Sequence, residues 1–227
     1  MFAKNSIKML VCDMAGTVIQ ENNIVYNNLF KTIKSIEPNV DRIDINKFYG
    51  FNKNEVLKYY INNKKDINLD EKEVMFNETK HKFNDMLRND YINNPNVKLI
   101  DPKLPKFFNN LRNNNIKITL NTGYNKEIQN ILIDKLNLLD CIDDYISSEE
   151  VKYSRPYPNM INTLMERNNI LKPKEVVKIG DTCIDIIEGH NANCHTIGVL
   201  SGSTPKYQLK QCKPTLILNN IIDLRLF

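Results

Sequence analysis

Five short apolar runs, rich in β-branched residues, restrict the fold of this chain more than any other feature. They occupy residues 7–13, 116–121, 175–181, 195–200 and 215–220. Because the apolar residues are consecutive and do not alternate with polar ones, the runs predict strands buried on both faces. Between them, apolar residues recur at helical spacing, as in 104–111 and 128–136. Strands that alternate with helices predict an α/β fold with a Rossmann-like, doubly wound, mostly parallel sheet.

The first two predicted strands are separated by a long stretch that contains no further apolar run of this kind. A crossover between parallel strands needs only one helix, so the stretch is too long for a simple connection. Its residues Val25, Leu29, Ile33 and Ile36 form one helical stripe. We therefore expect a helical cap domain over residues 20–96, inserted into a core domain made of 1–19 and 97–227.

Composition excludes several classes of function. The net charge is +4, but the lysines are scattered among acidic residues and asparagines, which argues against nucleic-acid binding. No apolar run approaches the roughly 18 residues of a membrane span, and we expect no membrane partner. The five cysteines lack a C-x-x-C pair, which predicts reduced intracellular thiols and a cytoplasmic protein.

Polar clusters follow three of the predicted strands, and a fourth lies in a loop. They are DMAGT (13–17), NTGY (121–124), SRPYP (154–158) and GDTCIDIIEG (180–189). Three of only seven glycines, Gly16, Gly123 and Gly180, lie at these strand ends, which indicates close approach of the backbone to a ligand. Ligands of parallel sheets bind at the carboxyl ends of strands. The sequence therefore predicts a site around Asp13, Thr122 and Asp181.

This ordered set resembles the haloacid dehalogenase superfamily over nearly the whole predicted core. The resemblance implies that Asp13 attacks phosphorus and that Thr122 and a basic residue bind phosphoryl oxygens. It also implies Mg²⁺, held by the Asp13 carboxylate, the Ala15 carbonyl and Asp181, with Asp185 acting through water or hydrogen bonds. The cation is chemically necessary, because converging carboxylates repel one another unless a metal neutralises them.

Two residues could supply the basic group, and Asp181 has an alternative role. The guanidinium of Arg155 suits a phosphoryl oxygen and the charge that develops during transfer. Many relatives use lysine at this step, so Lys152 is the alternative. An aspartate before a helix often caps the helix, and this is the alternative for Asp181 taken alone.

Ala15 stands where ordinary phosphatases of this superfamily carry a second aspartate, which protonates the leaving group. A positioned acid of this kind contributes about 10² to 10⁴ in rate. The D-x-A-G-T form resembles the phosphonatase branch, the phosphonoacetaldehyde hydrolases, which cleave a carbon–phosphorus bond. In that branch a cap lysine forms a Schiff base with the substrate, no alkoxide leaves, and the second acid is dispensable.

The segment YGFNKNEVLKYY (49–60) is similar to the G-x-x-K cap segment of that branch and offers Lys53, three residues after Gly50. An ordinary lysine has a pKa near 10.4 and is only ~0.04% neutral at pH 7. A Schiff-base Lys53 therefore requires a pKa lowered by burial or by neighbouring cations.

The resemblance extends to TGY (122–124), RPYP (155–158), KIGDT (178–182), EGHNA (188–192) and GVLSGS (198–203). It implies substrate-binding residues at Ala15, Gly16, Thr17, Gly50, Gly123 and Tyr124. The chain departs from the branch at three positions: Val56 replaces a histidine thought to shuttle protons, Tyr49 a methionine, and Ser154 a glycine.

These observations favour a Mg²⁺-dependent hydrolase that cleaves the C–P bond of phosphonoacetaldehyde or a similar small phosphonate. One alternative is a phosphatase or phosphonatase-like hydrolase of another small phosphorylated metabolite, in which Lys53 only binds charge. Another is a non-catalytic module that binds a phosphometabolite. The resemblance also suggests a homodimer formed through the cap.

Overall fold

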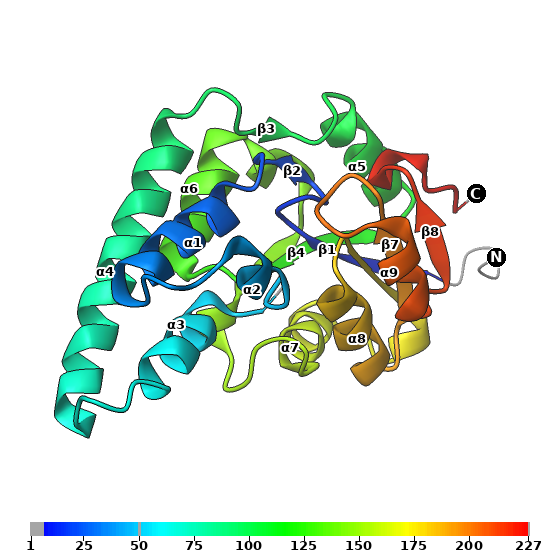
Figure 1. Ribbon diagram of the computed structural model, residues 1–227. Helices are drawn as coiled ribbons and strands as arrows, with labels where there is room; N and C mark the ends of the chain where they lie inside the picture. Colours follow the sequence, from blue (N-terminus) through cyan, green and yellow to red (C-terminus); the bar gives the residue numbers. More distant parts are fainter. Residues whose placement is uncertain (1–6, 50, 227) are drawn as a thin grey trace.

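The computed structural model describes residues 7–49 and 51–226 of the chain. Its main sheet has six parallel strands, in the order β5-β4-β1-β6-β7-β8 (Figure 1). The strands are β1 (Met9–Asp13), β4 (Lys117–Thr122), β5 (Asp144–Ser147), β6 (Val176–Gly180), β7 (His195–Val199) and β8 (Leu216–Leu218). Because the order runs outward from β1 in both directions, the sheet is doubly wound, and the predicted fold class is confirmed.

Burial on both faces explains why the apolar runs are continuous. Leu10 and Cys12 of β1 join the hydrophobic cluster on one face, whereas Met9 and Val11 join the cluster on the other. All four side chains are fully buried. The register places Asp13 opposite Asn121 on β4. The carboxyl ends of the central strands therefore meet at one edge of the sheet.

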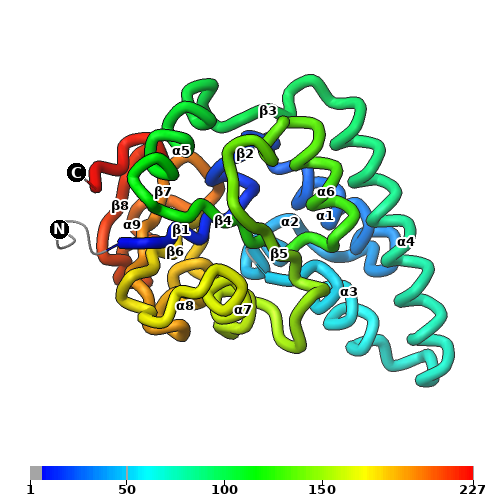
Figure 2. The backbone as a smooth tube through the Cα atoms, turned by 180° about the vertical axis from the view of Figure 1, so that it is seen from behind, coloured from blue at the N-terminus to red at the C-terminus, as the bar shows by residue number. Residues whose placement is uncertain are grey.

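Helices cover the two faces of this sheet, as Figures 1 and 2 show. On one face lie α5 (Leu104–Asn113) and α6 (Lys126–Lys135), and on the other lie α7 (Asn159–Arg167) and α8 (Cys183–Asn191). The shorter α9 (Lys206–Gln211) connects β7 to β8. Apolar residues such as Phe108 and Leu164 point from these helices into the two hydrophobic clusters.

The sequence patterns missed one strand of the main sheet. In β5 the first two residues, Asp144 and Tyr145, are only half-buried, and β5 lies at the edge of the sheet. An edge strand is covered less completely than a central one, so it carries polar residues and gives no continuous apolar run.

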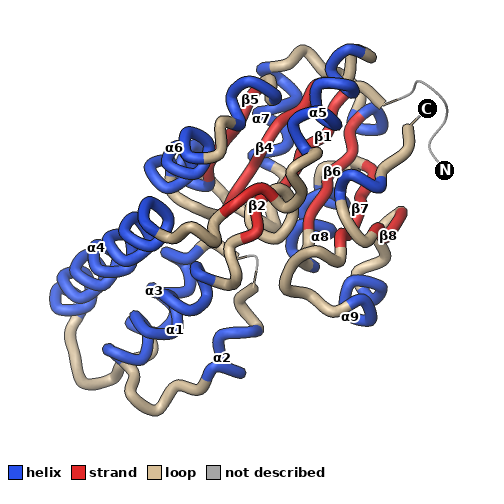
Figure 3. Tube along the Cα trace, turned by 90° about the horizontal axis from the view of Figure 1, so that it is seen from above, coloured by secondary structure: helices blue, strands red, loops and turns tan. Residues whose placement is uncertain are grey.

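In the described part of the chain, four helices lie between β2 (Ile19–Gln20) and β3 (Lys98–Leu99), which pair antiparallel with each other. They are α1 (Ile24–Ile36), α2 (Arg42–Asn46), α3 (Lys53–Asn62) and α4 (Leu69–Asn93). Figure 3 shows them as a separate group beyond one end of the strands. One hydrophobic cluster nevertheless includes Leu29 of α1 and Leu120 of β4. The division into a core and a cap at residues 20 and 97 stays a prediction.

The expectation of five reduced cysteines is wrong for two of them. Cys183, the first residue of α8, forms a disulfide with Cys212, which directly follows α9. The two residues are 29 apart in the sequence, without a pairing motif, but the fold brings their Cα atoms within 5.7 Å. The other three cysteines are buried free thiols. Within the described part of the chain, no helix is both long enough and apolar enough to cross a bilayer.

Candidate active site

Asp13 ends β1 and is followed by a tight turn over residues 14–19. The Gly16 N–H donates to the Ile19 carbonyl, and the Ile19 N–H donates to the Met14 carbonyl. Gly16 has φ of +82°, and a Cβ at this position would lie 2.8 Å from the Asp181 carboxylate. Glycine is therefore required twice, once by the backbone conformation and once by the approach of an acidic side chain.

One cavity at the carboxyl edge of the sheet gathers most of the predicted site residues. Its lining consists of Asp13, Ala15, Val25, Tyr26, Lys53, Thr122, Gly123, Tyr124, Arg155, Asp181, Thr182 and Asp185. Gly16 borders a neighbouring cavity with Glu21 and Ser203. Thr17 is fully buried and does not line either cavity. Gly50 lies outside the described residues.

Three buried aspartates converge in this cavity. One carboxylate oxygen from each of Asp13, Asp181 and Asp185 lies within 4.8 Å of the others. Burial raises the pKa of Asp13 and, with the charges of Asp13 and Asp185 beside it, raises the pKa of Asp181 to about 8. These shifts show the electrostatic cost of holding three carboxylates together.

The start of α8 orients Asp185, and the loop after β7 orients Asp181. Thr182 caps the helix, because its Oγ1 accepts from the backbone N–H of Asp185. The same Oγ1 donates to Asp185 Oδ2 at 2.6 Å, and the backbone N–H of Thr182 donates to this oxygen at 3.2 Å. The alternative role of Asp181 as the cap is therefore wrong. The Asp181 Oδ2 instead accepts hydrogen bonds from the backbone N–H and the hydroxyl of Ser203, at 2.7 and 3.1 Å.

Arg155 lies at the centre of the acidic cluster. Its Nη1 is 2.7 Å from Asp13 Oδ1 and 3.0 Å from Asp185 Oδ1, and its Nε is 3.2 Å from Glu188 Oε2. Its Nη2 donates to the backbone and side-chain oxygens of Asn121. The alternative, Lys152, is exposed and stacks over the ring of Tyr153.

A second buried cation, Lys178, supports this cluster from β6, and sequence reasoning assigned it no role. Its Nζ lies 2.9 Å from Asp185 Oδ1 and 3.5 Å from Glu188 Oε2, and donates to Asn121 Oδ1 at 2.7 Å. Asn121 in turn donates to both oxygens of Glu188. Although burial opposes it, the charges of Arg155 and Lys178 lower the pKa of Asp185 to about 2. Lys178, Asn121 and Glu188 lie within the KIGDT, NTGY and EGHNA segments. Membership of these segments was the only sign in the sequence that they belong to the site.

The donor atoms and the negative charge of the cluster fit one divalent cation. Four buried carboxylates and two buried cations make up the cluster: Asp13, Asp181, Asp185, Glu188, Arg155 and Lys178. With every group ionised the cluster carries a net charge of −2. Its three converging aspartates offer only oxygen atoms, the ligands that Mg²⁺ prefers. The residues present therefore fit a magnesium ion.

Lys53 reaches the same cavity from the first position of α3. Asn52 caps this helix by accepting from the backbone N–H of Asn54. The Lys53 side chain is buried, and its Nζ donates to the Phe51 carbonyl at 2.6 Å and lies 5.0 Å from the centre of the Tyr26 ring. Burial, reinforced by the positive charge of Arg155, lowers the pKa of Lys53 to about 8. About a tenth of this amine is then neutral at pH 7, far more than for an ordinary lysine.

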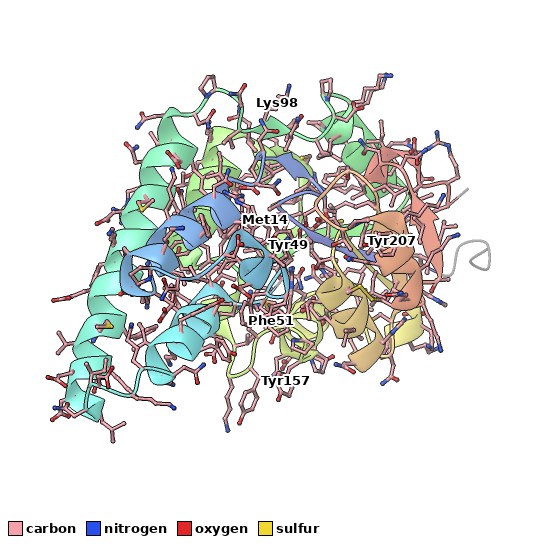
Figure 4. The ribbon with its side chains drawn as sticks, in the orientation of Figure 1. Met14, Tyr49, Phe51, Lys98, Tyr157 and Tyr207 are labelled. Carbon is pink, nitrogen blue, oxygen red and sulfur yellow. A yellow bond between two sulfur atoms is a disulfide. The ribbon has the colours of Figure 1, made fainter. Side chains whose placement is uncertain are left out.

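A cleft lies beside this site, between the segment before α3 and the helices α8 and α9. Tyr49 and Phe51 line one wall and Tyr207 of α9 lines the other (Figure 4). The cleft also reaches Thr182 and Ser203, which contact the aspartates.

The fold and the acidic cluster define a class of α/β hydrolase. The chain matches the haloacid dehalogenase-like hydrolase family over residues 10–199 and belongs to this family. The match includes the turn after β1, the loop of Arg155 and the start of α8.

Curated relatives narrow the comparison. The chain is 40% identical over 95 residues to a phosphonoacetaldehyde hydrolase of Latilactobacillus sakei, and 37% identical over 95 residues to one of Bacillus cytotoxicus. In both cases the similar region covers 41% of this chain and 36% of the relative. The similarity therefore spans only about a third of each relative's length.

Solved structures resemble the whole fold at low sequence identity. A phosphonoacetaldehyde hydrolase-like protein of Oleispira antarctica superposes with a TM-score of 0.80, at 17% identity, over 99% of this chain and 92% of the other. A β-phosphoglucomutase of Clostridium difficile gives a TM-score of 0.76, at 21% identity, over 96% and 93% of the two chains. At these identities the likeness concerns the fold alone.

Proposed function

We propose that this protein is a Mg²⁺-dependent phosphonatase that hydrolyses the C–P bond of phosphonoacetaldehyde or a similar small phosphonate with an aldehyde group. One observation carries the proposal: the buried amine of Lys53, with its lowered pKa, lines the same cavity as Asp13. A lysine that served only to attract a phosphate would not need a lowered pKa, because it would work equally well when fully charged. The similarity to phosphonoacetaldehyde hydrolases supports the same substrate.

The chemistry assigned to the chain has two halves. The neutral Lys53 amine adds to the aldehyde carbon, and loss of water leaves an iminium ion. Asp13 attacks phosphorus, and the electron pair of the broken C–P bond passes into the iminium to give an enamine. Protonation and hydrolysis release the aldehyde product from Lys53, and water releases phosphate from Asp13. No alkoxide departs, which agrees with Ala15 at the position of the usual second acid.

Arg155 and the neighbouring polar groups bind and orient the phosphonate in this scheme. The guanidinium beside Asp13 neutralises charge on the transferring group, and Thr122 offers a hydroxyl at the end of β4. Asp13, the Ala15 carbonyl and Asp181 would hold Mg²⁺, with Asp185 in support. When bound, the ion neutralises these acids and orients the phosphoryl oxygens.

The alternative is a phosphatase acting on another small phosphorylated metabolite. Val56 favours it, because a buried valine cannot shuttle the protons of imine chemistry. The phosphonatase and phosphatase functions can be distinguished by measuring phosphate release in the presence of Mg²⁺. Phosphonoacetaldehyde and phosphomonoesters are each tested with the wild type and with Lys53→Arg. The phosphonatase releases phosphate from the aldehyde and loses this activity in the variant. Hydrolysis of phosphomonoesters alone, insensitive to Lys53→Arg, would overturn the proposal.

A matched control is Lys58→Arg, on the same helix. Lys58 is exposed and lies over the ring of Phe76, away from the cavity. Its substitution should leave phosphate release unchanged, which distinguishes a specific effect of Lys53 from a general effect of charge on α3.

A further inference from the structure

Three buried oxygen-bearing groups form a chain that leads away from the cavity. Tyr124 lines the cavity, and its hydroxyl lies 2.6 Å from the hydroxyl of Tyr91 on α4. The Tyr91 hydroxyl lies 2.8 Å from Oε2 of Glu21, in the segment between β2 and α1. All three side chains are buried, and the two rings meet edge to face with centroids 5.7 Å apart.

The hydrogen bonds of this chain can all run toward Glu21 or all run away from it. Tyr91 has a single hydroxyl hydrogen, so when it donates to a Glu21 carboxylate, Tyr124 must donate to Tyr91. When Glu21 carries a proton, every bond can reverse: Glu21 donates to Tyr91, Tyr91 to Tyr124, and Tyr124 into the cavity. The two arrangements differ by one proton at Glu21.

The surroundings of Glu21 allow it to hold that proton. Burial raises the pKa of Glu21, and the charge of Asp13 acts in the same direction. The Val25 N–H, the Tyr91 hydroxyl and the charge of Lys53 oppose the increase without cancelling it. Burial also raises the pKa of Tyr124 well above its ordinary value, so Tyr124 remains a hydroxyl that can pass a proton on.

The proposed chemistry needs such a group near Lys53. Loss of water from the adduct of an amine and an aldehyde requires a proton on the departing oxygen. Val56, three residues after Lys53, is buried and carries no exchangeable side-chain proton. Arg155 and Asp185 are fixed in ion pairs with each other. Tyr124 shares the cavity with Lys53 and ends the chain from Glu21.

We propose that Tyr124 delivers a proton from Glu21, by way of Tyr91, to the oxygen that leaves as Lys53 forms its imine. Tyr124 is the catalytic residue of this step, and Tyr91 and Glu21 position the proton. The inference rests on the proposed phosphonatase function.

The step balances in atoms and charge. The C–O bond of the adduct breaks, and its oxygen takes the Tyr124 proton and leaves as water. Tyr124 takes the proton of Tyr91, and Tyr91 takes the proton of Glu21. The products are an iminium ion on Lys53 and a carboxylate at Glu21. No oxidant or reductant takes part.

The test is the rate at which phosphonoacetaldehyde forms a borohydride-reducible imine with the full-length protein, measured from pH 5.5 to 8. Glu21→Gln keeps a hydrogen-bond acceptor for Tyr91 but cannot carry the proton. We expect it to slow imine formation by about 10²-fold. Glu55→Gln, an exposed position on α3, is the matched control and should be unchanged.

The pH dependence separates proton delivery from a structural role. In the wild type the fraction of neutral Lys53 rises with pH below about 8, while the fraction of protonated Glu21 falls above its own pKa. The two trends cancel, so the rate is nearly flat between the two pKa values. In Glu21→Gln only the Lys53 trend remains, and the rate should rise about tenfold per pH unit. If the substitution only damaged the fold, the rate would be lower but its pH dependence would stay nearly flat, as in the wild type.

The outcomes are distinguishable. If the wild type forms an imine and Glu21→Gln matches it in rate and slope, proton delivery by Glu21 is overturned and the phosphonatase function stands. If the wild type forms no imine, both fail. Should Glu21→Gln not fold, Tyr91→Phe interrupts the chain while keeping the ring, and the same change in slope is expected.

Discussion

Arg155 Nη1 lies 2.7 Å from Asp13 Oδ1, although 142 residues separate the two in the sequence. The same nitrogen also faces Asp185, and the rest of the guanidinium contacts Asn121 and Glu188. A planar fork with several donors can serve all of these partners at once, whereas a lysine ammonium cannot. The proposed nucleophile is therefore held by a residue that three further residues contact: Asn121, Asp185 and Glu188.

Arg155→Lys keeps the positive charge but removes the planar guanidinium with its several N–H donors. We expect phosphate release to fall by about 10² to 10³, because a donor beside the reacting group is lost. Unfolding in urea should show a loss of about 1–3 kcal/mol, since buried acceptors lose their partners. Lys152→Ala, at the exposed alternative, should change neither quantity. The reverse pattern would identify Lys152 as the basic residue.

Mg²⁺ should stabilise the protein through the aspartate cluster. At a concentration of 100 times its dissociation constant it should add about 2.7 kcal/mol to the free energy of unfolding, which thermal melting detects. Asp181→Asn should abolish most of this increment together with phosphate release. Asp134→Asn, an exposed acid on α6, should preserve both. An equal response to Mg²⁺ in wild type and Asp181→Asn would remove Asp181 from the metal site.

Gly202 lies against the metal-binding cluster and should not tolerate a side chain. A Cβ at this position would overlap the Asp181 carboxylate, so Gly202→Ala should displace Asp181. We expect the apparent affinity for Mg²⁺, measured from the stabilisation by Mg²⁺, to fall at least tenfold, which corresponds to roughly 1.4 kcal/mol. Gly198→Ala is the matched control, because its Cβ would meet only ordinary contacts with Leu209 at 3.5 Å and Ile217 at 3.6 Å. Equal Mg²⁺ affinity in the two variants would show that the Asp181 position is not critical.

Lys53→Met should make the protein more stable and inactive. The pKa of Lys53 falls from 10.5 to about 8 on folding, so holding this buried amine charged at pH 7 costs about 3 kcal/mol. We expect the variant to gain about 1–3 kcal/mol in urea unfolding at pH 7. An exposed control, Lys58→Met, should stay within about 0.5 kcal/mol of the wild type.

The sign of the pH dependence follows from the same shift. Between about pH 8 and 10.4 the unfolded lysine holds its proton while the folded one releases it, so wild-type stability rises with pH. The advantage of Lys53→Met should therefore shrink over this interval. A variant that is less stable than the wild type at every pH would show that Lys53 is a structural residue.

Sequence patterns predicted the central strands because burial on both faces leaves a direct trace in consecutive apolar residues. Asp13, Thr122 and Asp181 could be expected together because the carboxyl ends of parallel strands share one edge. The edge strand β5 left no such trace. The disulfide of Cys183 and Cys212 depends on how α8 and α9 pack, which spacing alone does not specify.

The supporting residues of the site were harder to foresee. A lysine within a strand usually reaches toward water, so Lys178 gave no sign that it would be fully buried against Asp185 and Glu188. Glu21 carries no motif, and its contact with Tyr91 joins positions 70 residues apart. The burial of Lys53 is set by the packing of α3 against the rest of the molecule, which the G-x-x-K resemblance could suggest but not establish.

The most direct test of the phosphonatase proposal is to reduce the protein with borohydride in the presence of phosphonoacetaldehyde and Mg²⁺, and to locate the modified residue by mass spectrometry. The account predicts an N-ethyl group on Lys53 in the wild type, since the C–P bond has already broken, and a retained phosphonate on Lys53 in Asp13→Asn. An unmodified Lys53 in protein that still releases phosphate from the aldehyde would contradict it.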